Sequence, residues 1–179
     1  GDDYVMSVKS FKRLLALLSD KFSCVDLETF LLTDGNKYDK PLCHITFDDG
    51  YLDNLEVAMP LLKQFKLPAT VYITSGYIAK NKIPLHHYIY KLYNLGYDSL
   101  IETGINKFDL QYIFKGIEMD RNSIALLVSQ TSIQQQNKLC EYLIVKTGVN
   151  PDWSIFLTPN QLKSFSREPL ISIGSHTVS

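Results

Sequence analysis

The amino-acid sequence predicts an α/β fold in which parallel strands alternate with crossover helices. Two observations lead to this prediction. Short apolar runs of strand length alternate with segments whose apolar residues recur at helical spacing. Strands separated by such helices pair in parallel, with right-handed connections. The 179 residues, 45% of them hydrophobic, suffice for a domain with its own core.

The beginning of the chain predicts two helices around a short strand. Ser7 is a suitable N-cap for the first helix, and residues 22–25 form a strand-like run. Asp26 can cap the second helix, which is expected to end near residues 34–35. The apolar residues at helical spacing in the first helix are Val8, Phe11, Leu14, Leu15 and Leu18. The second helix is expected to bury Leu27, Phe30 and Leu31.

The central strand is expected over Leu42–Phe47, with His44 as a strand residue whose hydrogen bonds are satisfied. A helix follows over Leu55–Phe65. Pro60 lacks an N–H group, so it must lie at a kink or in the first turn of the main segment of this helix. Residues Ala69–Thr74 are the next predicted strand.

Residues 77–152 have the pattern of a helical segment, although residues 101–119 are ambiguous. The residues that begin and end its two predicted helices are Pro84 and Gly96 for the first, and Ser132, Gln135 and Gly148 for the second. A further capping box, Thr158 to Gln161 with Pro159 at the first helical position, begins a helix that ends near residue 166. The last strand is expected over Leu170–Ile173.

Composition argues against several classes of protein. The net charge is -1 and no long run of like charge occurs, so nothing suggests nucleic-acid binding. No apolar stretch approaches the roughly 18 residues of a membrane span, and we expect no signal peptide. Three cysteines cannot all pair with one another, which favours a reducing compartment such as the cytoplasm. Cys24 and Cys43 are expected to be buried strand thiols.

The run from Cys43 to Tyr51 carries the chemistry. An apolar strand stops at two adjacent carboxylates, Asp48 and Asp49, and Gly50 permits a sharp turn directly after them. Adjacent carboxylates repel each other unless a cation or a shared proton lies there. Because side chains alternate along a strand, the two should point in different directions, so that one can bind a metal while the other addresses its water. The alternative is a polar turn without a site. A calcium-binding EF-hand loop is excluded because its glycine and glutamate positions are not met.

Four segments together resemble the polysaccharide deacetylase family, the NodB-homology domain. They are Thr46–Tyr51, Ala58–Leu62, Leu67–Ile73 and Ile173–Ser179. The family's first motif, Thr-Phe-Asp-Asp-Gly-Tyr, is present without a mismatch. Its second motif, His-Ser/Thr-x-x-His, is met from His176 to Ser179, and the second histidine would be the next residue.

The resemblance implies a distorted (β/α) barrel that is incomplete in this chain. It further implies a single partial domain, residues 1–179, with residues 77–152 as a helical insertion within it. Barrel enzymes carry their active sites at the carboxyl ends of the strands. Asp48, Asp49 and His176 directly follow predicted strands, so we expect them to meet at one rim.

The resemblance also assigns roles. Asp48 corresponds to the catalytic base, whereas Asp49 and His176 correspond to ligands of a divalent metal, for which zinc is favoured. The implied activity is metal-dependent hydrolysis of a non-peptide C–N amide bond, which removes the acetyl group from an N-acetylated sugar or polysaccharide. The expected partner is therefore an N-acetylated glycan.

The family's second histidine, its arginine-bearing loop and its C-terminal Leu-His motif do not occur in residues 1–179. We therefore expect this chain to be a fragment that binds metal weakly and is inactive alone. Unpaired edges of an incomplete barrel predict association into a homo-oligomer. Two alternatives stay open, namely a deacetylase-like enzyme for a small non-sugar amide and a non-catalytic glycan-binding domain.

Overall fold

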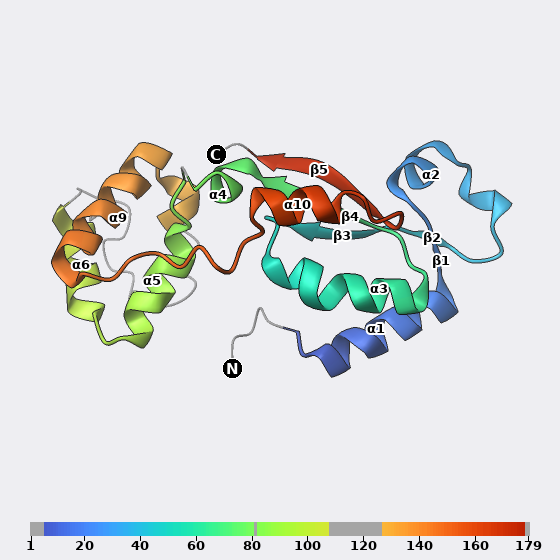
Figure 1. Cartoon of the computed structure of the whole chain (residues 1–179), viewed down its shortest axis with the longest axis horizontal. Coiled ribbons are helices and arrows are strands. Elements are labelled where there is room, and N and C mark those ends of the chain that lie inside the picture. The colour runs from blue at the N-terminus through green and yellow to red at the C-terminus, as the bar shows by residue number, and fades with distance from the viewer. Residues whose placement is uncertain (1–5, 81, 108–126, 178–179) are drawn as a thin grey trace. The chain divides into compact units, whose positions relative to one another are not determined.

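The computed structural model describes residues 6–80, 82–107 and 127–177 (Figure 1). The chain forms two compact units. Residues 1–78 and 154–178 make the first unit, which combines strands and helices. Residues 79–153 make the second unit, whose described elements are helices. The predicted α/β class is confirmed for the first unit.

The first unit is built on a parallel sheet of three strands in the order β3-β4-β5. The strands are β3 (Ile45–Asp48), β4 (Ala69–Thr74) and β5 (Ile171–Thr177). Two shorter strands, β1 (Ser23–Cys24) and β2 (Leu42–Cys43), form a separate parallel pair. Within the described ranges the strands make these two sheets and no closed barrel.

The expectation of one continuous strand over Leu42–Phe47 is wrong, because the chain changes sheets at His44. The His44 Nδ1 atom lies 2.8 Å from the Val25 carbonyl oxygen, and its Nε2 atom lies 2.9 Å from Thr70 Oγ1. A carbonyl can only accept, so Nδ1–H donates to Val25 and Nε2 accepts from the Thr70 hydroxyl. The imidazole thus links the end of β1 to β4 with both nitrogens satisfied, as the sequence predicted.

Three helices cover the apolar face of the three-stranded sheet (Figure 1). They are α1 (Val8–Lys21), α3 (Met59–Phe65) and α10 (Pro159–Phe165). Alternation along β4 turns Ala69, Val71 and Ile73 toward these helices. Leu62 on α3 and Phe165 on α10 pack against these strand residues and are almost fully buried. Each such side chain contributes roughly 1.5–3 kcal/mol of hydrophobic stabilisation.

The caps predicted at Ser7, Asp26 and Thr158 are confirmed. Ser7 and Asp26 each accept a hydrogen bond from a backbone N–H of the first turn. Thr158 and Gln161 form the expected reciprocal capping box with Pro159 in the first turn. Pro60 lies in the first turn of α3, directly after a π-helical segment, η2 (Asn54–Ala58), so the proline falls where the helix changes its hydrogen-bond pattern.

The predicted burial of helix α2 (Leu27–Leu32) is wrong, because none of its residues is buried. Phe30 and Leu31 are 41% and 68% exposed. A helical period shows which side chains share a face, but it does not supply a surface to cover that face. A helix of only six residues is also too short for its own side chains to shield that face from solvent. Two further short helices in this unit are η1 (Gly35–Lys37) and α4 (Ser75–Ile78).

The second unit packs three described helices around a core of its own. They are α5 (Leu85–Asn94), α6 (Asp98–Lys107) and α9 (Ile133–Thr147). The capping box of Ser132 with Gln135 is confirmed, and Gly148 ends α9 at a φ of +69°. Helix α6 occupies part of the ambiguous stretch, and the rest of that stretch lies outside the described residues. That this unit is an insertion stays a prediction.

No helix in the described part of the chain has both the length and the apolar character needed to cross a membrane. Cys24 and Cys43 are register partners on β1 and β2, and both are free thiols. They are half-buried rather than buried as expected. Burial, together with the neighbouring Cys43, raises the pKa of Cys24 to about 11, so the Cys24 thiol stays protonated at neutral pH.

We predict that Gly174→Ala destabilises the first unit. Gly174 lies opposite Tyr72 in the sheet, and a Cβ atom at Gly174 would come within 2.6 Å of the Tyr72 ring. Overpacking of this kind costs about 1–3 kcal/mol. Urea denaturation followed by circular dichroism measures the change in the free energy of unfolding. The matched control is Gly35→Ala, where no atom lies within 4 Å of the added methyl group. Equal stability of the two variants would contradict the prediction.

Candidate functional site

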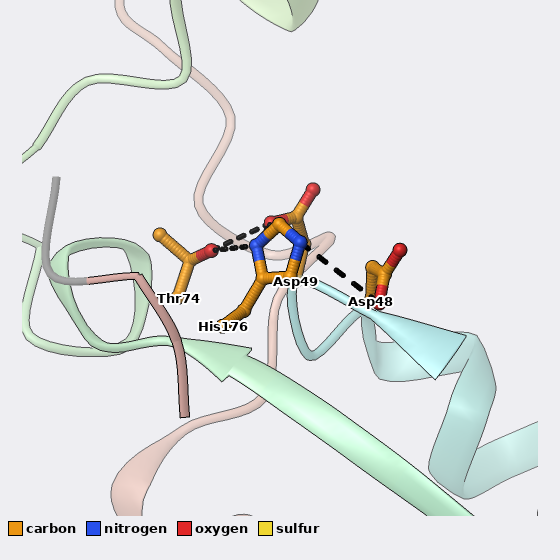
Figure 2. A network of polar contacts seen from close by, with 4 residues as sticks. All are labelled: Asp48, Asp49, Thr74 and His176. Carbon is orange, nitrogen blue, oxygen red and sulfur yellow. Dashed lines mark hydrogen bonds and ion pairs between the residues drawn. The ribbon is translucent and has the colours of Figure 1, made fainter. Parts of the chain in front are cut away.

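The structure brings the three predicted site residues together at the carboxyl ends of neighbouring parallel strands (Figure 2). Asp48 is the last residue of β3, and Asp49 follows it. His176 is the penultimate residue of β5. Both strands run further toward their carboxyl ends than predicted, so Asp48 and His176 belong to their strands rather than follow them. Central strand β4 lies between the two and holds them at the same edge of the sheet.

A tight turn separates the two carboxylates. The Gly50 N–H donates to the Asp48 carbonyl oxygen at 2.9 Å, a bond between residues two apart that closes a γ-turn centred on Asp49. Asp49 accordingly adopts a φ of +68°, which is uncommon outside glycine and is enriched in aspartate and asparagine. The Asp48 side chain is 62% exposed, whereas that of Asp49 is 23% exposed. The two carboxylates therefore differ in exposure. The prediction that they point in different directions assumed strand alternation, whereas here Asp49 lies in a γ-turn beyond the end of β3.

Thr74, the last residue of β4, contacts both Asp49 and His176 (Figure 2). Its hydroxyl donates to Asp49 Oδ1 at 2.6 Å and lies 3.4 Å from His176 Nδ1. The side chain is fully buried. Sequence reasoning missed this residue. Its position at the carboxyl end of the strand between the two motifs could have indicated it, since β4 was itself predicted correctly.

A β-bulge places the His176 ring. Ile73 pairs with Ser175 and Thr74 pairs with Thr177, which leaves His176 as an extra residue on β5. Bulges of this kind redirect a side chain at the end of a strand. The ring lies between the two acids, with Nδ1 3.4 Å from Asp49 Oδ1 and Nε2 3.9 Å from Asp48 Oδ1.

A distant segment pins the loop that carries Asp49. The Leu52 N–H donates to the Ile155 carbonyl at 2.8 Å, and the Leu157 N–H donates to the Gly50 carbonyl at 2.9 Å. Between these bonds the rings of Tyr51 and Phe156 stack with centroids 5.1 Å apart. The loop after β3 is therefore fixed by the backbone on both sides of Phe156.

Tyr77 packs on the other side of this aromatic contact, with its ring centroid 4.7 Å from that of Phe156. Burial raises the pKa of Tyr77 to about 12, and the Asp49 carboxylate contributes to the rise. Burial and Asp49 also raise the pKa of Tyr51. Both phenol groups therefore stay neutral at physiological pH, and the negative charge of Asp49 helps to keep them neutral.

The donor set at the site fits a divalent metal ion. Asp49 supplies a carboxylate and His176 an imidazole, which are donors that first-row metals accept together. Of the two imidazole nitrogens, Nδ1 faces Thr74 and Asp49, and Nε2 faces only Asp48, beyond hydrogen-bond distance. No group of three or more His, Cys, Asp or Glu side chains among the described residues could hold a metal. Asp49 and His176 would together supply two ligands to such an ion.

Comparison with known proteins identifies one family. The profile of the family described as "Polysaccharide deacetylase" matches residues 35–179. A segment of 45 residues is 40% identical to the "Putative polysaccharide deacetylase YxkH" of Bacillus subtilis (strain 168), covering 25% of this chain and 16% of that protein. The de-N-acetylase from Aggregatibacter actinomycetemcomitans has a similar structure, with a TM-score of 0.52 and 15% identity. That match covers 98% of this chain and 47% of the other, so this chain spans about half the length of that structural relative.

We predict that Gly50→Ala destabilises the site more than a positive φ alone explains. Gly50 has a φ of +74°, and a Cβ atom there would lie 2.7 Å from Ile73 Cδ1. The left-handed backbone costs an alanine about 1–2 kcal/mol, and the overpacking adds about 1–3 kcal/mol. The control is Gly148→Ala, which has a φ of +69° and no atom within 4 Å of the added methyl group. Chemical denaturation of both variants gives the two costs, and a smaller loss for Gly50→Ala than for Gly148→Ala would refute the prediction.

Proposed function

Because the chain belongs to the polysaccharide deacetylase family, we propose that it carries the metal-binding and base residues of an enzyme that removes acetyl groups from an N-acetylated sugar or polysaccharide. The observation that carries this proposal is the contact of Asp49 with His176 beside the exposed carboxylate of Asp48. Asp49 accepts a hydrogen bond from Thr74 and is largely shielded, whereas Asp48 is mostly exposed to solvent. A metal ligand must be held in place, whereas a group that takes up a proton must be accessible to water and substrate.

Asp49 and His176 are the proposed ligands of a divalent metal, for which zinc is favoured because it accepts mixed oxygen and nitrogen donors. A bound metal supplies two things to amide hydrolysis, since it polarises the carbonyl group and lowers the pKa of a bound water. The Thr74 hydrogen bond occupies Asp49 Oδ1. Asp49 Oδ2 and His176 Nε2 are therefore the atoms we propose as ligands.

Asp48 is the proposed general base. Its side chain is 62% exposed, and its Oδ1 atom lies 3.9 Å from His176 Nε2, the proposed ligand atom. A carboxylate in that place can accept the proton of the water that attacks the amide carbonyl. The family resemblance assigns protonation of the leaving amine to a histidine motif that residues 1–179 do not contain. Residues 1–179 alone are therefore proposed to be inactive.

The three-stranded sheet is proposed to be part of the wall of a distorted (β/α) barrel. Parallel sheets are usually covered on both faces, and here helices cover the face that carries Val71. On the opposite face Thr46, Asp48 and Ser172 are exposed. The structural likeness to a de-N-acetylase over 47% of its length supports this proposal. Association of chains through β3 and β5, the free edges of this sheet, is the alternative proposal, because it would pair the backbone groups of those edges.

We predict that Asp48→Asn strongly slows acetate release but keeps metal binding. The amide cannot accept the proton of the attacking water, and loss of a general base lowers the rate by about 10²–10⁴-fold. Acetate release from N-acetylglucosamine oligomers is measured with the protein expressed together with all sequence that its gene encodes. The matched control, Asp53→Asn, changes an exposed carboxylate at the start of η2 and should leave the rate unchanged.

Asp49→Asn and His176→Ala should instead lose the metal, as measured by isothermal titration with zinc, and lose activity with it. Activity that survives in Asp48→Asn would remove the base assignment. Tight zinc binding without acetate release from any glycan would favour a small non-sugar amide as substrate. Absence of both zinc binding and activity from the wild-type protein would favour a non-catalytic glycan-binding domain.

A further inference from the structure

Thr74 contacts both proposed metal ligands and binds no substrate or metal in the proposed mechanism. We propose that it is a positioning residue with two effects. It holds the Asp49 carboxylate in place, and it sets the tautomer of His176 so that the proton lies on Nδ1 and the lone pair lies on Nε2. The inference rests on the proposed function for its purpose, but the tautomer itself can be tested in the metal-free protein.

The first step concerns the hydroxyl proton of Thr74. A threonine hydroxyl has one proton to donate and two lone pairs that accept. The 2.6 Å distance to Asp49 Oδ1 is typical of a charge-assisted O–H···O⁻ bond. An ionised carboxylate cannot donate, so the Thr74 proton must point to Asp49. The Thr74 oxygen is then left as an acceptor toward His176.

The second step concerns the His176 ring. Nδ1 lies 3.4 Å from Thr74 Oγ1 and 3.4 Å from Asp49 Oδ1. Both of these oxygens act as acceptors there, so a proton on Nδ1 is stabilised and a lone pair on Nδ1 is repelled. Nε2 then carries the lone pair of the neutral ring. Histidines that bind metals keep this arrangement, with one nitrogen donating to a neighbour while the other holds the metal.

Burial and strand pairing hold Thr74 in a fixed position. Thr74 is fully buried at the end of the central strand, which pairs with β3 on one side and β5 on the other. Asp49 sits in an uncommon backbone conformation, with a φ of +68°. A hydroxyl that cannot move away fixes the carboxylate in this strained turn before any metal arrives. The ligand pair is therefore preorganised by β4, a strand that supplies neither ligand.

The test compares Thr74→Val, which keeps the shape and removes the hydroxyl, with Thr74→Ser, which keeps the hydroxyl. Thr70→Val is the matched control, because Thr70 is also buried on β4 and also bonds a histidine ring, that of His44. Nitrogen-15 NMR of the imidazole rings distinguishes the two tautomers. It is recorded on metal-free protein at about pH 8, where an ordinary imidazole is neutral.

The wild-type protein and Thr74→Ser should show His176 with its proton on Nδ1. Thr74→Val should show a mixture of both tautomers, because the Asp49 carboxylate is then free to rotate. Thr70→Val should alter the signals of His44 and leave those of His176 unchanged. A His176 tautomer that is the same in Thr74→Val as in the wild-type protein would overturn the proposal. If Thr74→Val does not fold, Thr74→Ala removes the hydroxyl without added bulk.

A titration with Co²⁺, followed by visible absorption, provides the second readout. Loss of a neighbour that orients a metal ligand costs about 10–100-fold in metal affinity, and we expect a loss of that size for Thr74→Val. Thr74→Ser and Thr70→Val should bind Co²⁺ within a few-fold of the wild-type affinity. A wild-type protein that binds no Co²⁺ would remove the metal assignment of the proposed function. The tautomer comparison would then decide the role of Thr74 by itself.

Discussion

The parallel pairing of β4 with both β3 and β5 is the constraint on which the candidate site depends. The carboxyl ends of parallel strands lie at the same edge of a sheet, so residues far apart in the sequence meet there. Asp49 and His176 lie close together because only one strand, β4, stands between β3 and β5. The γ-turn after β3 and the bulge in β5 then turn the carboxylate and the imidazole toward Thr74 at the end of that middle strand.

Sequence reasoning succeeded where the information was local. The caps at Ser7 and Thr158 were predictable because a side chain and an N–H three residues later suffice to form them. The acids at Asp48 and Asp49 and the imidazole of His176 stood out as motifs, and the α/β class followed from the periodicity. Their catalytic and metal-binding roles stay predictions.

What depends on the surroundings was not predictable. The exposure of Leu31 depends on whether another element covers α2, which the helix's own sequence does not encode. The break at His44 depends on two partners that are distant in the sequence, Val25 directly after β1 and Thr70 on β4. Thr74 carries no motif, and only the meeting of three strands gives it a role. The two β4 threonines show the difference, because Thr70 donates to an imidazole whereas the Thr74 proton goes to a carboxylate.

Residues 155–157, here called the clasp, hold the loop at Gly50 through backbone hydrogen bonds. This contact bears on how the fold can vary during evolution. The clasp and β5 both return to the sheet after the helical unit of residues 79–153. The entropy of closing a connection grows only with the logarithm of its length, so doubling the connection costs about 0.6 kcal/mol. Descendants of one ancestral gene can therefore lengthen, shorten or replace the helical unit at little thermodynamic cost, provided that the clasp keeps its place.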